Sequence, residues 1–193
     1  MIFLITILVV LIMVLSIASP FFLSWKNCRN ILNQSAIYLV LSVGMTFVIC
    51  MGEIDLSVGA IIGFSGMIMG MLCVAGVPSL AAALLGLAVS ALINGALVAY
   101  VKISSFIVTL ASMTVLRGVI LVWTNSKPIY GFSDIFTFLG SGKIGPINVP
   151  IVLSLLIAVI GAVILHKTVL GNYCLFCGTS ALALNRSGVD VKK

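Results

Sequence analysis

Two carboxylates stand close together in a short polar stretch, Met51-Gly52-Glu53-Ile54-Asp55-Leu56-Ser57, between two long apolar runs. We call residues 51–57 the break segment. At membrane depth such a break has to line protein or a water-filled cavity, and Asp55 and Ser57 would then lie on a substrate pathway. The alternative is a short turn at the membrane face, in which Asp55 or Ser57 caps the following helix at its positive end. We favour the turn, although both interpretations require the break.

Two amide side chains are further candidates for a substrate pathway. Asn94 lies inside an apolar run, and Asn125 follows another. A sugar is held by hydrogen bonds to its hydroxyl groups, so amides that face a cavity would suit it. An amide inside a membrane more commonly forms a hydrogen bond between two helices, and that alternative stays open for both residues.

The sequence offers little material for metal or redox chemistry. It contains one histidine and five cysteines, and the CxxC formed by Cys174 and Cys177 has neither the four ligands of a structural zinc site nor a thioredoxin-like context. A phosphate-binding loop of the GxxxxGK[ST] type is missing from the sequence. We therefore expect no cofactor, no metal and no ATP hydrolysis on this chain alone.

The composition indicates how these residues are positioned. Of the 193 residues, 62% are hydrophobic and only 7% are charged, which is typical of an integral membrane protein. Apolar runs near the length of a membrane span, about 20 residues, lie at 2–19, 35–51, 58–77, 80–101, 106–123 and 149–165. The predicted fold class is therefore all-α, a polytopic transmembrane helix bundle of about six spanning helices. Residues 125–149, rich in Gly, Ser and Pro, are expected to form an external loop or a short interfacial helix.

The basic residues predict the orientation only weakly. The net charge is +6, and the Lys and Arg side chains lie mostly between or after the apolar runs, where they meet anionic headgroups. A slight excess predicts that both termini are cytoplasmic, with a bundle at 1–167 and a cytoplasmic segment at 168–193. In that segment residues 181–185 are expected to form a short helix that ends at Gly188. We expect a lipid bilayer and no nucleic acid as partner.

Small residues repeat on two helical faces. Gly59, Gly63, Gly66 and Gly70 recur every three or four residues, and Ala82, Gly86, Ser90 and Asn94 recur every four. Stripes of this kind let neighbouring helices approach closely. They predict helix packing and say nothing about function.

Taken together and in order, nine blocks of residues resemble the ribose-type sugar ABC transporter permeases of the branched-chain amino acid/ribose permease superfamily. The blocks are Asn33-Gln34-Ser35, Val43-Gly44-Met45-Thr46, Gly52 to Gly59, Asn94-Gly95, Phe106 to Leu110, Leu116-Arg117-Gly118, Thr124-Asn125 with Pro128-Ile129, Thr168 with Leu170-Gly171, and Ser187-Gly188-Val189 with Val191.

The resemblance implies a permease subunit of the bacterial inner membrane. Such a subunit forms a homodimer, receives a monosaccharide from an extracytoplasmic sugar-binding protein, and is driven by a separate ATP-binding cassette subunit. It also implies a short cytoplasmic coupling helix that contacts the ATPase after the sixth span. Gly178, Ala183, Ser187 and Gly188 keep the pattern of that helix.

The chain departs from the family pattern in two respects. Leu182, Leu184, Ser104 and Asn172 replace a Glu, an Ala, a Pro and an Arg that are usual there. The family also continues through several more membrane helices, so we expect a C-terminally truncated permease, a fragment, or one completed by another chain. Two alternative functions stay open: an ion-coupled secondary transporter that uses Glu53 or Asp55, and a fragment that transports nothing.

Overall fold

The structure is a computed structural model that describes residues 2–78, 80–86, 88 and 103–189. Its elements are α1 (Ile2–Ala18), α2 (Trp25–Cys50), α3 (Val58–Val74), α5 (Ser105–Thr124), α6 (Asp134–Ser141), β1 (Lys143–Ile144), β2 (Ile147–Asn148), α7 (Val149–Lys167) and α8 (Val169–Arg186). Residues 80–86 are helical as well. The strands form one short antiparallel hairpin. The predicted all-α class is therefore confirmed.

Five of the six predicted spans are helices, and most of the fourth lies outside the described residues. In the described part, α2, α5 and α7 are long and apolar enough to cross a membrane, and α1 and α3 are shorter apolar helices. Helix α2 begins earlier than predicted, at Trp25, because the Ser24 side chain caps it by accepting a hydrogen bond from the Asn27 amide at 3.3 Å. The cap explains why the polar residues before the apolar run at 35–51 are also helical.

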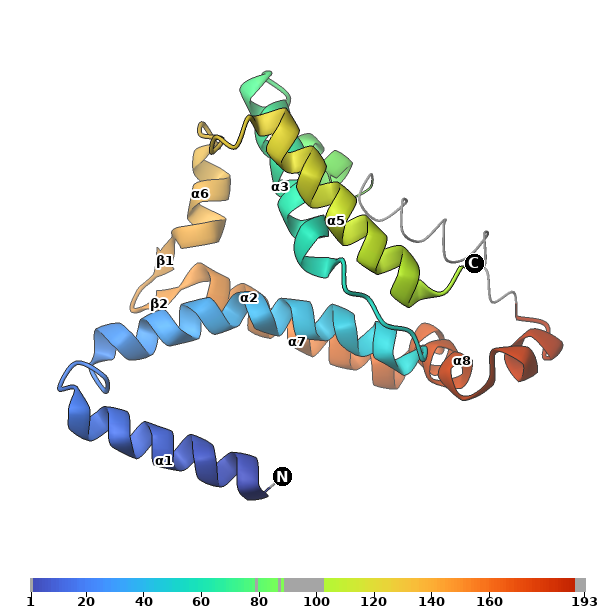
Figure 1. Cartoon of the computed structure of the whole chain (residues 1–193), viewed down its shortest axis with the longest axis horizontal. Coiled ribbons are helices and arrows are strands. Elements are labelled where there is room, and N and C mark those ends of the chain that lie inside the picture. The colour runs from blue at the N-terminus through green and yellow to red at the C-terminus, as the bar shows by residue number, and fades with distance from the viewer. Residues whose placement is uncertain (1, 79, 87, 89–102, 190–193) are drawn as a thin grey trace.

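Helices α2 and α7 form one packed pair. Val43 and Phe47 of α2 contact Gly161 of α7, and β2, which immediately precedes α7, contacts α2 as well. The two helices lie side by side and run in the same direction (Figure 1). A side chain at Gly161 would collide with Val43, so the pair depends on the absence of one.

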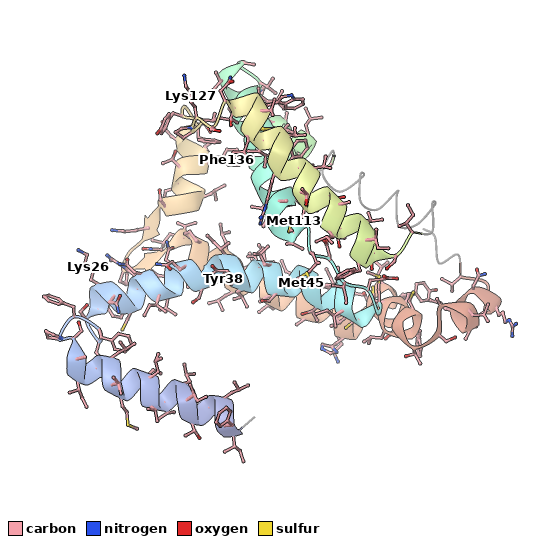
Figure 2. The ribbon with its side chains drawn as sticks, viewed as in Figure 1. Lys26, Tyr38, Met45, Met113, Lys127 and Phe136 are labelled. Atoms are coloured by element: carbon pink, nitrogen blue, oxygen red, sulfur yellow. The ribbon has the colours of Figure 1, made fainter. Side chains whose placement is uncertain are left out.

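Helices α3 and α5 form the second pair, which also runs in parallel. Its buried core consists of Ala60, Phe64, Met67 and Leu116, and Met113 packs against it between the two helices (Figure 2). The rings of Phe64 and Trp123 lie 6.4 Å apart. A Cβ added at Gly63 would lie 3.3 Å from the Ile120 side chain. The first predicted glycine stripe therefore contributes to this interface, although Gly59 and Gly66 face open space.

The second predicted stripe lies partly in the described residues. Ala82 is fully buried, and a Cβ at Gly86 would lie 2.7 Å from the carbonyl oxygen of Ser65 in α3. The helix at 80–86 therefore packs closely on α3, as small residues allow. Ser90 and Asn94 lie outside the described residues.

The two pairs meet at the break segment (Figure 1). The start of α5, the end of α7 and α8 lie near this junction, and α6 and the hairpin connect the opposite ends of the two pairs. Helix α6 fulfils the expectation of a short helix within 125–149. Helix α1 lies apart from the pairs and has no buried residue. This arrangement gathers the break segment, the start of α5 and α8 around one junction (Figure 1).

Candidate functional site

The break segment begins where a glycine ends α2. Gly52 has a φ of +80°, a conformation that side chains rarely adopt. Its amide donates to the Ile49 carbonyl at 2.9 Å, and the Glu53 amide donates to the Val48 carbonyl at 3.1 Å. These bonds satisfy carbonyl groups at the end of the helix. The glycine therefore turns the chain at the end of α2.

Asp55 holds the start of α3 through its carboxylate. The Asp55 Oδ1 atom accepts hydrogen bonds from the Ser57 amide at 2.7 Å and from the Ser57 hydroxyl at 2.6 Å. Ser57 is fully buried, and α3 follows directly after it. A carboxylate at this position also interacts favourably with the positive end of the helix. The local geometry is a turn in which Asp55, and not Ser57, supplies the acceptor.

The break segment is also bonded to the start of α5. The Ser105 hydroxyl donates to the Glu53 carboxylate, and the Ile54 amide lies 3.4 Å from the Ser105 oxygen. One turn further along α5, the Thr109 hydroxyl lies 3.4 Å from the Ile54 carbonyl. Ser105 and Thr109 are 8% and 3% exposed, whereas their partners Glu53 and Ile54 lie at the surface. Two sequence blocks far apart in the chain thus form one polar cluster.

The predicted pathway residues do not all come together. Asp55 and Ser57 lie in the break segment next to the cluster and are bonded to each other, whereas Asn125 caps the far end of α5 with a left-handed φ of 50°. Helix α5 has 20 residues, which places Asn125 roughly 30 Å from the cluster. Asn94 lies outside the described residues. Within the described part, therefore, Asp55 and Asn125 do not share a site.

Sequence reasoning assigned no role to Ser105 and Thr109. Ser105, Thr109 and Ser112 are all buried on α5, and they follow one another at intervals of four and three residues. That spacing puts the three hydroxyl groups on one face of an otherwise apolar helix. The polar stripe was therefore a readable signal that α5 meets a polar partner.

The segment predicted to couple to an ATPase is part of α8, which is longer than expected and kinked. Ser180 departs from helical geometry, with φ −163° and ψ 97°, and its hydroxyl oxygen accepts a hydrogen bond from the Ala183 amide at 3.2 Å. Gly188, with φ +86°, follows the last turn, and the Val189 amide donates to the Leu184 carbonyl at 3.4 Å. The kink thus isolates a short helix that contains Ala183 and ends at Gly188.

A groove of about 380 Å³ runs along this kinked part of α8. Its lining is mostly apolar and includes Tyr173, Phe176, Ala183, Leu184 and Ser187. Two of the predicted coupling residues, Ala183 and Ser187, therefore face the same groove.

Gly178, the remaining predicted coupling residue, lies against the end of α2. A Cβ at Gly178 would collide with the Cys50 carbonyl oxygen and lie 3.3 Å from the Gly52 nitrogen. The backbones of α8 and the break segment are therefore in direct contact.

The CxxC of α8 lies near a third cysteine, Cys50. Burial raises the pKa of the Cys174 thiol, and the neighbouring Cys177 and Cys50 raise it further. A raised pKa keeps the thiol protonated and weakly nucleophilic. Among the described residues, no group of three or more His, Cys, Asp or Glu side chains could hold a metal ion.

Comparison with known proteins places the chain among transport proteins. A family described as "Branched-chain amino acid transport system / permease component" matches residues 27–193. The "Ribose import permease protein RbsC" of Bacillus subtilis is 40% identical over 191 residues, or 96% of this chain and 59% of the relative. That of Haemophilus influenzae is 36% identical over 193 residues, or 96% and 60%. No solved structure matches the chain significantly.

A relative named for a different sugar is nearly as similar. The "D-allose transport system permease protein AlsC" of Escherichia coli is 37% identical over 182 residues, which is 92% of this chain and 56% of the relative. The chain thus spans about 60% of the length of the curated relatives that it matches.

Proposed function

The chain belongs to the family of branched-chain amino acid transport system permease components, and from this premise we propose that it acts as the membrane permease subunit of an ATP-driven monosaccharide importer. Its membership confirms the predicted resemblance to this superfamily. Together with the apolar helices, it also confirms the predicted location as a multi-pass protein of the inner membrane. The observation that carries the proposal is the identity of 36% to 40% with ribose import permeases along almost the whole chain.

The proposal includes three protein partners. A separate ATP-binding cassette subunit hydrolyses ATP, an extracytoplasmic sugar-binding protein delivers the monosaccharide, and a second permease copy completes the translocation path. Residues 168–193 form the cytoplasmic segment that meets the ATPase, through Gly178, Ala183, Ser187 and Gly188. The groove lined by Ala183 and Ser187 supports this role, since a mostly apolar groove on an exposed helix suits a protein contact.

Within this proposal, Asp55, Ser57, Asn94 and Asn125 belong to the substrate pathway. Asp55 and Ser57 act near the end that carries α8, whereas Asn125 acts at the opposite end of α5. A sugar that crosses the membrane would therefore meet Asp55 and Asn125 one after the other. Its hydroxyl groups would exchange hydrogen bonds with amide and carboxylate oxygens.

Reconstituted transport tests the proposal. The chain is purified with its candidate ATPase subunit, and ribose uptake into proteoliposomes is measured with ATP and the binding protein present. We expect uptake that needs both chains and ATP, and a matched control carries an ATPase subunit whose phosphate-loop lysine is replaced. Uptake that persists unchanged without ATP would reject the importer function.

An ion-coupled secondary transporter is the alternative, favoured only by the two carboxylates of the break segment. Asp55→Asn separates the two functions, because the amide oxygen can still accept both bonds from Ser57 while the charge is lost. An ATP-driven importer should retain most of its uptake in this variant. Uptake driven by a proton or sodium gradient, and abolished by Asp55→Asn, would favour ion coupling.

Cysteine labelling tests the side on which α8 lies. Ser187 is exposed, so Ser187→Cys in a background without native cysteines presents one accessible thiol. We expect no reaction with an impermeant maleimide in intact cells, and reaction once the membrane is opened. Labelling from outside would overturn the cytoplasmic placement, and protection by added ATPase subunit would support the contact.

A further inference from the structure

At Gly178, helix α8 lies against backbone atoms of the end of α2 and the start of the break segment. The space for a Cβ at Gly178 is filled by the Cys50 carbonyl, and a Cβ at Gly52 would lie 3.7 Å from the Gly178 Cα atom. Two glycines thus face each other with no side chain between them. Glycines have no side chain that could rotate away, so a movement of α8 toward α2 presses on the backbone of Cys50 and, through it, on Gly52.

The break segment passes such a movement on to α5. Gly52 is followed directly by Glu53 and Ile54, whose carboxylate and amide are the groups bonded to Ser105. The Ile54 carbonyl lies within reach of the Thr109 hydroxyl. Hydrogen bonds that involve a charged group are stronger than neutral ones, and the Ser105 side of this bond is buried, whereas Glu53 lies at the surface.

The helices on either side of this connection are packed as pairs. Helix α2 packs along α7, and α3 packs along α5. Displacement of a few atoms at the junction therefore shifts whole helices with respect to one another, as in hinge motions about a short loop.

We propose that Gly178 and Ser105 are positioning residues of one connection, in which the break segment transmits a displacement of α8 to the start of α5. The functional meaning of the connection rests on the proposed function, because it would link the ATPase-facing segment to the helix that ends at Asn125. Its existence does not depend on transport. Coupling between two sites is reciprocal, so a substitution at Ser105 should also change the local stability of α8 around Gly178.

Hydrogen exchange measured by mass spectrometry on the full chain in lipid nanodiscs tests the connection. Ser105→Ala removes one hydroxyl and adds no atoms, so the fold should survive. We expect roughly fivefold faster exchange in the break segment and around Gly178, the effect of about one net hydrogen bond. The matched control is Thr114→Ala, which removes an exposed hydroxyl bonded only to the Leu110 carbonyl of its own helix. Unchanged exchange around Gly178 in Ser105→Ala would overturn the proposal.

The forward direction uses Gly178→Ala, which places a methyl group against the Cys50 carbonyl. We expect faster exchange of the α5 amides at residues 107–112, and we expect this increase to vanish when Ser105→Ala is also present. Gly118→Ala is the control, since a Cβ there meets nothing within 4 Å. An equal increase with and without Ser105 would show that the effect bypasses the hydrogen bond, and would overturn the connection.

These measurements use neither ATP nor sugar, so they test the connection independently of the proposed function. If the substitutions change hydrogen exchange as expected but the chain supports no sugar uptake, the connection is supported and the importer function is rejected. Uptake by a chain without coupled exchange would keep the importer and reject the connection.

Discussion

The Ser105 hydroxyl of α5 donates a hydrogen bond to the carboxylate of Glu53, which holds the start of one helix to the loop between two others. This contact joins residues 52 positions apart in the sequence. It lies at the point where the α2 and α7 pair meets the α3 and α5 pair. The stability of that junction is therefore open to direct tests.

Removing the Ser105 hydroxyl should weaken the junction. Ser105→Ala deprives Glu53 of a donor and Ile54 of an acceptor, and we expect a loss of about 1 kcal/mol in the free energy of unfolding. Thermal unfolding in detergent, followed by circular dichroism, measures the loss. Thr114→Ala should unfold like the parent chain, and an equal effect of both substitutions would contradict a special role for Ser105.

The Asp55 carboxylate should stabilise α3 chiefly as a hydrogen-bond acceptor. Asp55→Ala removes both bonds to Ser57, and we expect it to cost about 1 kcal/mol, the net value of a typical hydrogen bond. Asp55→Asn should cost clearly less, because its amide oxygen keeps the acceptor. The same unfolding measurement compares the two variants, and a similar loss in both would indicate that the charge itself is needed.

The close approach of α2 and α7 should tolerate no side chain at Gly161. Gly161→Ala places a methyl group against Val43, and we expect a loss of about 1 to 3 kcal/mol from overpacking. Adding Val43→Ala removes the colliding methyl group and should recover part of the loss. Gly118→Ala, at an open helical position, should be neutral or stabilising, and failure of the double variant to recover would argue against the contact.

The short helix at the end of α8 should depend on Gly188. Its φ of +86° is unfavourable for any residue with a Cβ, so Gly188→Ala should cost about 1 to 2 kcal/mol locally. Hydrogen exchange at residues 183–188 should become faster, and exchange in α7 should not change. Gly140→Ala, which meets nothing within 4 Å and has no positive φ, is the matched control.

The reactivity of Cys174 should depend on pH and on its neighbours. Burial raises its thiol pKa, followed by the effects of Cys177 and Cys50, so less thiolate is present at a given pH. Its maleimide labelling rate should therefore rise with pH until the raised pKa is passed. Cys177→Ser removes one cause and should speed labelling at fixed pH, by roughly threefold for each half unit of pKa. Cys28→Ser serves as the control, and a rate unaffected by Cys177→Ser would contradict the proposed influence.

The sequence alone predicted most of the described apolar helices, although α2 begins earlier and α8 is longer than predicted. Apolar runs near the length of a membrane span predicted the helices, since backbone groups in lipid have to be bonded within the segment. Gly52 and the two carboxylates after it predicted the break, and the Gly, Ser and Pro residues of 125–149 predicted an external loop or a short interfacial helix. These features depend on neighbours along the chain, which is why they are readable one segment at a time.

Tertiary structure alone decided which helices pack together and which polar groups meet. Apolar side chains cover most of every long helix, so the pattern does not specify whether α2 packs on α7 or on α3. The bond from Ser105 to Glu53 and the contact of Gly178 with Cys50 join segments far apart in the chain. Such contacts form only where a gap in one surface fits a backbone or side chain of another. This fit depends on how the whole chain packs, because no local spacing of residues encodes it.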